Sequence, residues 1–307
     1  MPMSLHLGLD LGGTNLKWAV VDGGAQPRLM KTDRVPTDTS EGERSVVRQL
    51  IEVARTVIRD HERIDTIGLG MPGFIDPDAG ITRLIPNIPG NWDGVPVIAQ
   101  MTEALAMPVG LVNDARAFTL AEHRLGAGRG ATSMLGITLG TGVGGGLILG
   151  GRLYLGHSGS AGEFGHQTIL PDGPRCNCGN KGCLEAVARA DAIAAACGQP
   201  TAEEAVAAAR AGDLRAQEGL IDAGRYLGIG AANVVVLLSV DRVVVGGGVA
   251  AAGDLLLEPL RKELVSRVHV SDVERVKVAR AELGVWAGGI GAALFGAEPR
   301  ASDLHFV

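Results

Sequence analysis

Residues 5–22 read LHLGLDLGGTNLKWAVVD, which is an apolar run, a glycine turn at 12–14 and a second apolar run. The same plan returns at residues 133–149 as SMLGITLGTGVGGGLIL. Apolar runs on either side of a glycine turn predict two strands joined by a hairpin. The two copies lie roughly 128 residues apart, which is too far for a solenoid repeat. We therefore predict an internal duplication and two related lobes.

Strands alternate with helices along the rest of the chain, which is typical of an α/β fold. We predict further strands at 67–71, 109–114 and 242–245, and helices at 41–63, 95–106, 115–125, 185–197, 201–211, 213–238 and 284–296. A smaller α/β lobe is predicted at 1–112, completed by a C-terminal helix at about 290–307. The larger lobe is predicted at 113–289, with a cleft between the two.

Composition excludes several classes of protein. The net charge of −6 over 307 residues offers no basic surface for a phosphate backbone, and 3 % aromatic content offers no base-stacking platform, so we expect no nucleic acid partner. The opening residues lack a basic segment followed by an apolar one, and no apolar run reaches the ~20 residues of a membrane helix. Three of the four cysteines fall within eight residues, which suits a metal site in a reducing compartment. We expect a soluble cytoplasmic protein without a membrane partner.

Three glycine-rich turns follow predicted strands. The first, at 10–15, offers consecutive N–H groups for phosphate oxygens, with Asp10 placed to hold a hydrated Mg²⁺, although a hairpin alone would also need these glycines. The second, at 140–146, has more glycines than a hairpin needs and favours phosphate binding. The third, at 246–248, suits either a nucleotide or close helix packing. None matches a Walker A loop or a dinucleotide fingerprint.

Other candidate residues carry carboxylate, imidazole or thiol groups. Asn113 and Asp114 end a strand and precede a helix, where a helix cap and a catalytic group are both common. Glu163 and His166 lie in a glycine-rich loop suited to binding a polyol. Three cysteines on a tight knuckle, with His166 ten residues earlier, predict a closed Cys₃His zinc site of structural type, formed by His166, Cys176, Cys178 and Cys183.

Taken together and in this order, these motifs resemble the ROK family of repressors, open-reading-frame proteins and kinases, and within it the bacterial glucokinases. The resemblance implies the actin-like ATPase, or ribonuclease H-like, duplicated fold. It places Gly12, Gly13, Thr14, Lys17, Thr141 and Gly142 at the ATP phosphates, and Gly246, Gly247 and Gly248 near the adenosine. It makes Asp114 the general base. It assigns the sugar hydroxyls to Gly73, Asn87, Asn113, Asp114, Glu163, His166 and Glu185, so that His166 uses one ring nitrogen on zinc and the other on sugar.

The implied activity is ATP- and Mg²⁺-dependent phosphorylation of a hexose 6-hydroxyl, most simply glucose to glucose 6-phosphate. Kinases for N-acetylglucosamine, N-acetylmannosamine or fructose, and donors other than ATP, remain alternatives. A sugar-sensing regulator of the same family would need a DNA-binding segment before Leu5, for which we see no room. The resemblance also implies a homodimer or homotetramer. One departure is Arg116, where the family has Asn.

Overall fold

The computed structural model describes residues 4–61 and 63–298, which form two compact units. The first unit contains the described residues up to Leu125, the segment Leu155–Ser160 and the residues from Val285 onward. The second contains Gly126–Tyr154 and Ala161–Gly284. The chain therefore passes between the units four times, after Leu125, Tyr154, Ser160 and Gly284, whereas we predicted boundaries near residues 112 and 290.

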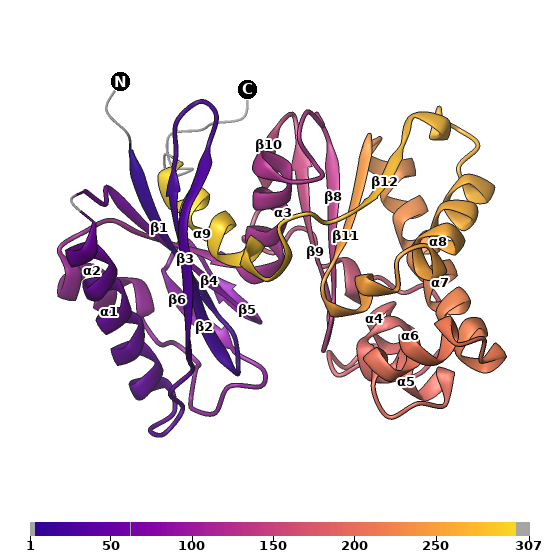
Figure 1. Cartoon of the computed structure of the whole chain (residues 1–307), viewed down its shortest axis with the longest axis horizontal. Coiled ribbons are helices and arrows are strands. Elements are labelled where there is room, and N and C mark those ends of the chain that lie inside the picture. Colours follow the sequence, from indigo (N-terminus) through magenta and orange to yellow (C-terminus); the bar gives the residue numbers. More distant parts are fainter. Residues whose placement is uncertain (1–3, 62, 299–307) are drawn as a thin grey trace. The chain divides into compact units, whose positions relative to one another are not determined.

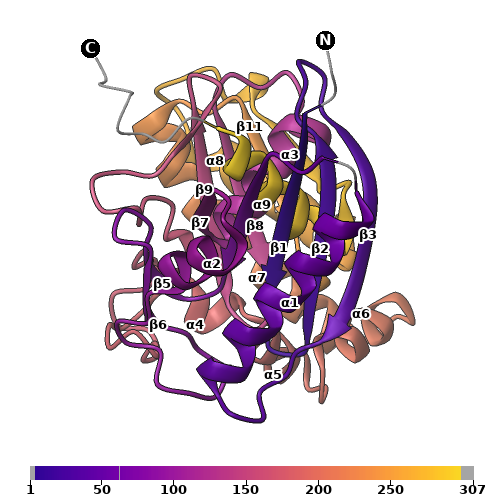
Figure 2. The same ribbon diagram turned by 90° about the vertical axis from the view of Figure 1, so that its left-hand side faces the viewer.

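The first unit is built on a five-stranded sheet in the order β3-β2-β1-β4-β7. Strands β1, β2 and β3 pair antiparallel, whereas β1, β4 and β7 run parallel. Helices α1 and α2 lie on one side of this sheet, and α9 and α3 on the other (Figures 1 and 2). A separate hairpin joins β5 and β6. The elements are β1 (Leu5–Leu11), β2 (Asn15–Asp22), β3 (Arg28–Pro36), α1 (Glu43–Asp60), β4 (Thr66–Met71), β5 (Phe74–Asp76), β6 (Ile81–Leu84), α2 (Val97–Leu105), β7 (Val109–Asn113), α3 (Asp114–Leu125) and α9 (Ala287–Ala297).

The second unit repeats this plan with a five-stranded sheet in the order β10-β9-β8-β11-β12. Its first three strands pair antiparallel, and β8, β11 and β12 run parallel. The shared order confirms the internal duplication and is that of the duplicated actin-like ATPase fold. The elements are β8 (Met134–Leu139), β9 (Val143–Leu149), β10 (Arg152–Tyr154), η1 (Phe164–His166), α4 (Glu185–Ala188), α5 (Ala190–Cys197), α6 (Ala202–Arg210), α7 (Leu214–Leu238), β11 (Arg242–Gly246), η2 (Gly248–Ala252), α8 (Asp254–Arg267), η3 (Val273–Arg275) and β12 (Lys277–Arg280); η4 (Gly284–Trp286) leads back to the first unit.

Close backbone packing explains many of the glycines in the first unit. A Cβ on Gly68 of β4 would overlap the Ala292 carbonyl of α9, and one on Gly291 of α9 would overlap the Ala117 carbonyl of α3. Glycine at these positions lets α9 lie directly on the sheet and on α3. Helix α3 therefore belongs to the first unit, although we predicted the larger lobe to begin at residue 113.

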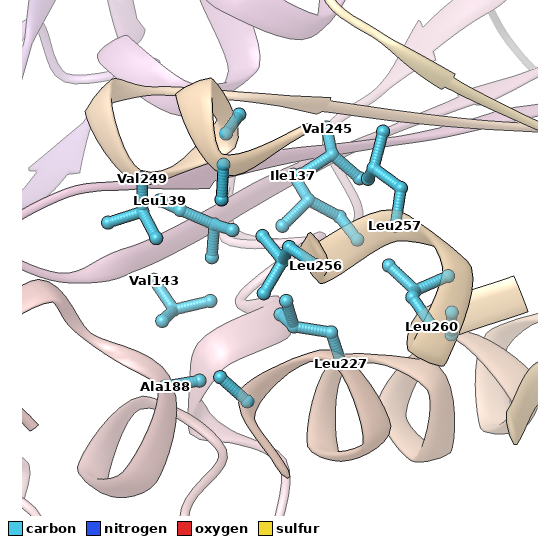
Figure 3. Close-up of a cluster of buried hydrophobic side chains, with 14 of the residues drawn as sticks. Ile137, Leu139, Val143, Ala188, Leu227, Val245, Val249, Leu256, Leu257 and Leu260 are labelled. Carbon is cyan, nitrogen blue, oxygen red and sulfur yellow. The ribbon is translucent and has the colours of Figure 1, made fainter. Parts of the chain in front are cut away.

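The core of the second unit lies between its sheet and α7 and α8 (Figure 3). Ile137 and Leu139 of β8 and Val245 of β11 face Leu227 of α7 and Leu256 of α8, and all five are buried. Helix α7 is long and apolar enough to cross a membrane by length and composition alone, but half of that stretch is buried inside the protein. Its apolar composition is therefore accounted for as that of a core helix.

Several predicted boundaries differ from the structure. Strand β9 begins at Val143, so Gly144, Gly145 and Gly146 lie in a strand, and only residues 140–142 form the second turn. A Cβ at Gly145 would lie 2.6 Å from that of Phe164, so close packing explains this glycine. The predicted helix at 185–197 is two helices, α4 and α5, and strands β3, β5, β6, β10 and β12 and helix α8 were not predicted. Residues 299–307 of the predicted C-terminal helix lie outside the described residues.

Candidate functional site

Polar residues converge at the carboxyl edge of the three parallel strands in the first unit. Asp10 is the last but one residue of β1, Gly73 follows β4, and Asn113 ends β7 immediately before Asp114 opens α3. The register pairs Asp10 with Gly70, and Met71 with Asn113, so these strand ends are level. This edge is where open α/β sheets bind their ligands.

Asn113 provides the cap of helix α3. Its side-chain oxygen accepts from the backbone N–H of Ala115 at 3.0 Å and of Arg116 at 3.4 Å, and its amide nitrogen donates to the Gly73 carbonyl at 3.1 Å. These bonds satisfy the exposed N–H groups of the first turn and tie it to the loop after β4. Of the two residues that sequence offered as a cap, Asn113 therefore carries that role. The Asp114 carboxylate accepts only the adjacent Ala115 N–H among the bonds that the structure assigns to it, at 2.8 Å.

The Asp114 carboxyl has the electrostatics of a proton acceptor. Although the residue keeps some exposed surface, burial of its carboxyl and then the nearby Asp10 carboxylate raise its pKa from 3.8 to about 6. The Ala115 N–H, Arg116 and Lys17 act in the opposite direction. A general base works best when its pKa lies close to the working pH. Asp114 is thus ionised at neutral pH and basic enough to take a proton.

Asp10 forms an ion pair with Lys17, whose Nζ lies 2.5 Å from Oδ2. The carboxylate is buried and rests against the first turn of α9, where a Cβ on Gly288 would lie 2.5 Å from Oδ2. A buried carboxylate is the type of ligand that Mg²⁺ prefers. The donor chemistry of Asp10 therefore fits the cation that we predicted there.

The first glycine turn is held by its neighbours in the same unit. Gly12 donates to the Asn15 carbonyl at 3.0 Å, and the hydroxyl of Thr37 donates to the Gly12 carbonyl at 2.7 Å. A Cβ on Gly13 would lie 3.0 Å from the carbonyl oxygen of Asn87, a residue with a φ of 63°. Gly13 and Thr14 are exposed, so the turn presents open backbone next to Lys17 and Asp10. Thr37 was missed because its role depends on the β2–β3 pairing, which no local motif signals.

The second glycine turn, Gly140–Gly142, is held by the segment that follows the cysteines. The Gly140 carbonyl accepts from the Ala190 N–H at 2.9 Å, and the Val143 N–H donates to Oε2 of Glu185 at 3.0 Å. A Cβ on Gly142 would lie 2.7 Å from that same Oε2. Thr141 at the tip is exposed. The turn is therefore fixed at both ends, with an open tip.

Gly246, Gly247 and Gly248 lie beside this turn in the second unit. Gly246 ends β11 and pairs with Thr138 of β8. Gly247 has a φ of 87°, and a Cβ there would overlap the backbone of Leu139. Conformation and packing thus require Gly247, and the exposed backbone of Gly247 and Gly248 leaves the surface open to a ligand.

The four predicted metal ligands are brought together in the second unit. One ligand atom from each of His166, Cys176, Cys178 and Cys183 lies within 4.8 Å of the others. Cys178 Sγ is 3.7 Å from Cys183 Sγ, and Cys176 Sγ is 3.7 Å from His166 Nδ1. A tetrahedral zinc with Zn–S bonds of about 2.3 Å has S···S edges of about 3.8 Å, so these distances fit a Cys₃His zinc site. The fourth cysteine, Cys197, is buried against the Ala216 carbonyl and lies outside this cluster.

The remaining predicted sugar ligands in this unit surround the cluster. His166 turns Nδ1 toward Cys176, and its Nε2 lies 3.9 Å from Oε2 of Glu163. Glu185 places Oε1 3.7 Å from Cys176 Sγ. One ring nitrogen of His166 therefore faces the thiols while the other faces a carboxylate, which is compatible with the two uses that the resemblance implies.

Comparisons with known proteins agree with this geometry. A model of the ROK family matches residues 6–298. The glucokinase of Thermotoga maritima is 35 % identical over 315 aligned positions, which cover 95 % of this chain and 97 % of the relative.

Solved structures give the same result. The ROK hexokinase of Thermus thermophilus superposes with a TM-score of 0.83 at 41 % identity, covering 95 % of this chain and 98 % of the other. A ROK family glucokinase from Streptomyces griseus, in complex with glucose and AMPPNP, superposes with a TM-score of 0.80 at 31 % identity, covering 96 % of this chain and all of the other (100 %).

Proposed function

The chain belongs to the ROK family, and from this premise we propose that it is an ATP-dependent glucokinase, which phosphorylates the 6-hydroxyl of glucose. The observation that carries the proposal is the Asp114 carboxyl, which is free of the capping role and has a pKa raised to about 6. Relatives that are similar along nearly their whole length include a glucokinase and a hexokinase at 35 % and 41 % identity, and an N-acetylmannosamine kinase at 30 % identity.

In the proposed reaction Asp114 accepts the proton of the sugar 6-hydroxyl as that oxygen attacks the γ-phosphorus of ATP. The bond from the γ-phosphorus to the bridging oxygen breaks, and ADP leaves. We assign the phosphates to Gly12, Gly13, Thr14, Lys17, Thr141 and Gly142, and the adenosine side to Gly246, Gly247 and Gly248. Open backbone N–H groups and the Lys17 ammonium suit the charge of the transferred group.

We assign the sugar hydroxyls to Gly73, Asn87, Asn113, Asp114, Glu163, His166 and Glu185. Asn113 has one amide hydrogen left after its bond to the Gly73 carbonyl, so it can serve sugar and helix at once. Glu163 is exposed beside His166 Nε2, where it can accept from a hydroxyl.

Two metals belong to the proposal. Asp10 would hold Mg²⁺, which neutralises phosphate charge when bound. His166, Cys176, Cys178 and Cys183 would hold a structural Zn²⁺, because four ligands fill its shell and leave no open position for a water nucleophile. Zinc would keep the loop from 163 to 185 in place and take no part in the chemistry.

The choice of sugar and donor is tested by one coupled assay. The kcat/KM is measured for glucose, fructose, N-acetylglucosamine and N-acetylmannosamine with ATP, and for glucose with polyphosphate. We expect glucose with ATP to be the best pair. A higher kcat/KM for an amino sugar or for polyphosphate would contradict the assignment. We also propose a cytoplasmic enzyme that assembles as a homodimer or homotetramer, which sedimentation of the purified protein tests.

A further inference from the structure

Glu185 contacts two features of the second unit that the proposed function treats separately. Its Oε2 accepts the Val143 N–H at 3.0 Å, at the end of the Gly140–Gly142 turn. Its Oε1 lies 3.7 Å from the Sγ of the metal-ligand residue Cys176. A single carboxylate therefore lies against both the turn and the metal cluster.

The backbone strengthens this link. Glu185 opens α4 only two residues after Cys183, and the Cys183 carbonyl accepts the Ala186 N–H at 3.0 Å in the first turn of that helix. Beyond α4, the Ala190 N–H donates to the Gly140 carbonyl at 2.9 Å. The segment 183–190 thus begins at a metal ligand and holds the turn at both of its ends.

The space around Glu185 is restrictive. A Cβ on Gly142 would lie 2.7 Å from Oε2, so the carboxylate occupies the volume that a side chain in the turn would need. The other carboxylate oxygen, Oε1, lies against the Cys176 thiol. A carboxylate held in this way fixes the Val143 N–H and, through it, the backbone of the turn.

We propose that Glu185 is a positioning residue that couples the zinc cluster to the Gly140–Gly142 turn, so that the zinc site supports nucleotide binding as well as sugar binding. The inference rests on the proposed function, in which this turn binds ATP phosphates. It differs from a role through His166 alone, because that route would change only the affinity for sugar.

The test measures AMPPNP affinity by calorimetry in the absence of sugar, together with zinc content and far-UV circular dichroism. In the folded wild-type protein we expect zinc removal by a chelator to weaken AMPPNP binding about tenfold, the effect of losing one hydrogen bond to a charged group. In zinc-loaded protein Glu185→Ala should weaken binding by a similar factor. Zinc removal from Glu185→Ala should then add less than about threefold, because the link is already cut.

Two variants serve as matched controls. Glu185→Gln keeps an oxygen that can accept the Val143 N–H, so it should retain most of the AMPPNP affinity. Glu163→Ala removes a carboxylate beside His166 Nε2, the ring nitrogen opposite the one that faces Cys176, so it should lower glucose affinity and leave AMPPNP affinity unchanged.

Thr141→Ala separates failure of the inference from failure of the proposed function. If Thr141→Ala weakens AMPPNP binding and zinc-loaded Glu185→Ala does not, the coupling is overturned and the phosphate role of the turn stands. If neither variant changes AMPPNP affinity, the phosphate role of the turn falls and the coupling falls with it. Should zinc removal unfold the protein, the comparison of zinc-loaded Glu185→Ala with Glu163→Ala decides alone, and equal AMPPNP affinities would overturn the inference.

Discussion

The pH dependence of catalysis follows from the surroundings of Asp114. Burial and the Asp10 carboxylate raise the pKa of this carboxyl to about 6. With a pKa of about 6, about one tenth of the free enzyme carries an ionised Asp114 at pH 5. With the ordinary value of 3.8, more than about nine tenths would be ionised at that pH. We therefore expect kcat/KM for glucose at pH 5 to be about tenfold below its plateau above pH 7.

The assay is initial-rate kinetics from pH 4.5 to 8.5 at saturating ATP, compared between the wild type and Asp10→Asn. Removing the Asp10 charge lowers the pKa of Asp114, and it also releases Lys17, whose charge acts in the same direction. The acid limb of Asp10→Asn should therefore move to lower pH, whatever the loss in its maximal rate. The ionisation of ATP is the same in both assays, so it does not contribute to a difference between the two pH profiles. A limb that stays in place, or a wild-type rate that is flat down to pH 5, would refute the reasoning.

Three further predictions concern stability and metal. Gly291→Ala puts a methyl group into the Ala117 carbonyl and should lower the free energy of unfolding in urea by about 3 kcal/mol. The control Gly24→Ala, whose methyl group would make only ordinary contact with Asp22, should change the free energy of unfolding little. Equal effects of the two substitutions would contradict the close packing of α9. Elemental analysis should find about one zinc per chain, and Cys178→Ser should lower zinc content and glucose affinity together; active protein without zinc would rule out the site. Asp114→Asn should raise stability by up to about 3 kcal/mol above pH 6, where the buried carboxylate is charged, and by less than about 1 kcal/mol near pH 4; a loss of stability at pH 8 would contradict its burial cost.

The parts of the fold that were predictable are those with strong local patterns. Apolar runs that end in glycine predicted β1, β8 and β11. The repeat of a strand, a glycine turn and a second strand predicted the internal duplication, because both copies are recognisable from local sequence alone. Strand β3 was missed because most of its residues are exposed and charged residues interrupt its apolar ones, which leaves no apolar alternation. Helix α8 was missed because Pro259 lies inside it, and proline ordinarily argues against a helix interior.

The candidate site was predictable as a set of residue types, and the division of roles among them was not. The sequence predicted that Asn113 and Asp114 lie at a helix start. Which of the two caps the helix depends on the tertiary hydrogen bond that orients the Asn113 side chain on the Gly73 carbonyl. Likewise, Gly145 was counted toward phosphate binding, although it is required by the Phe164 side chain. The contact of Glu185 with Val143 joins residues 42 positions apart, which no local spacing reveals.

The central claim is that Asp114 is the proton acceptor of a glucokinase, and one variant tests it most directly. Asp114→Asn keeps the size of the side chain and an oxygen for the Ala115 N–H, and Asn113 still caps α3. We predict that turnover with ATP and glucose falls by ~10²–10⁴, while the glucose Kd measured by calorimetry changes by less than about threefold. Turnover close to that of the wild type would contradict the claim.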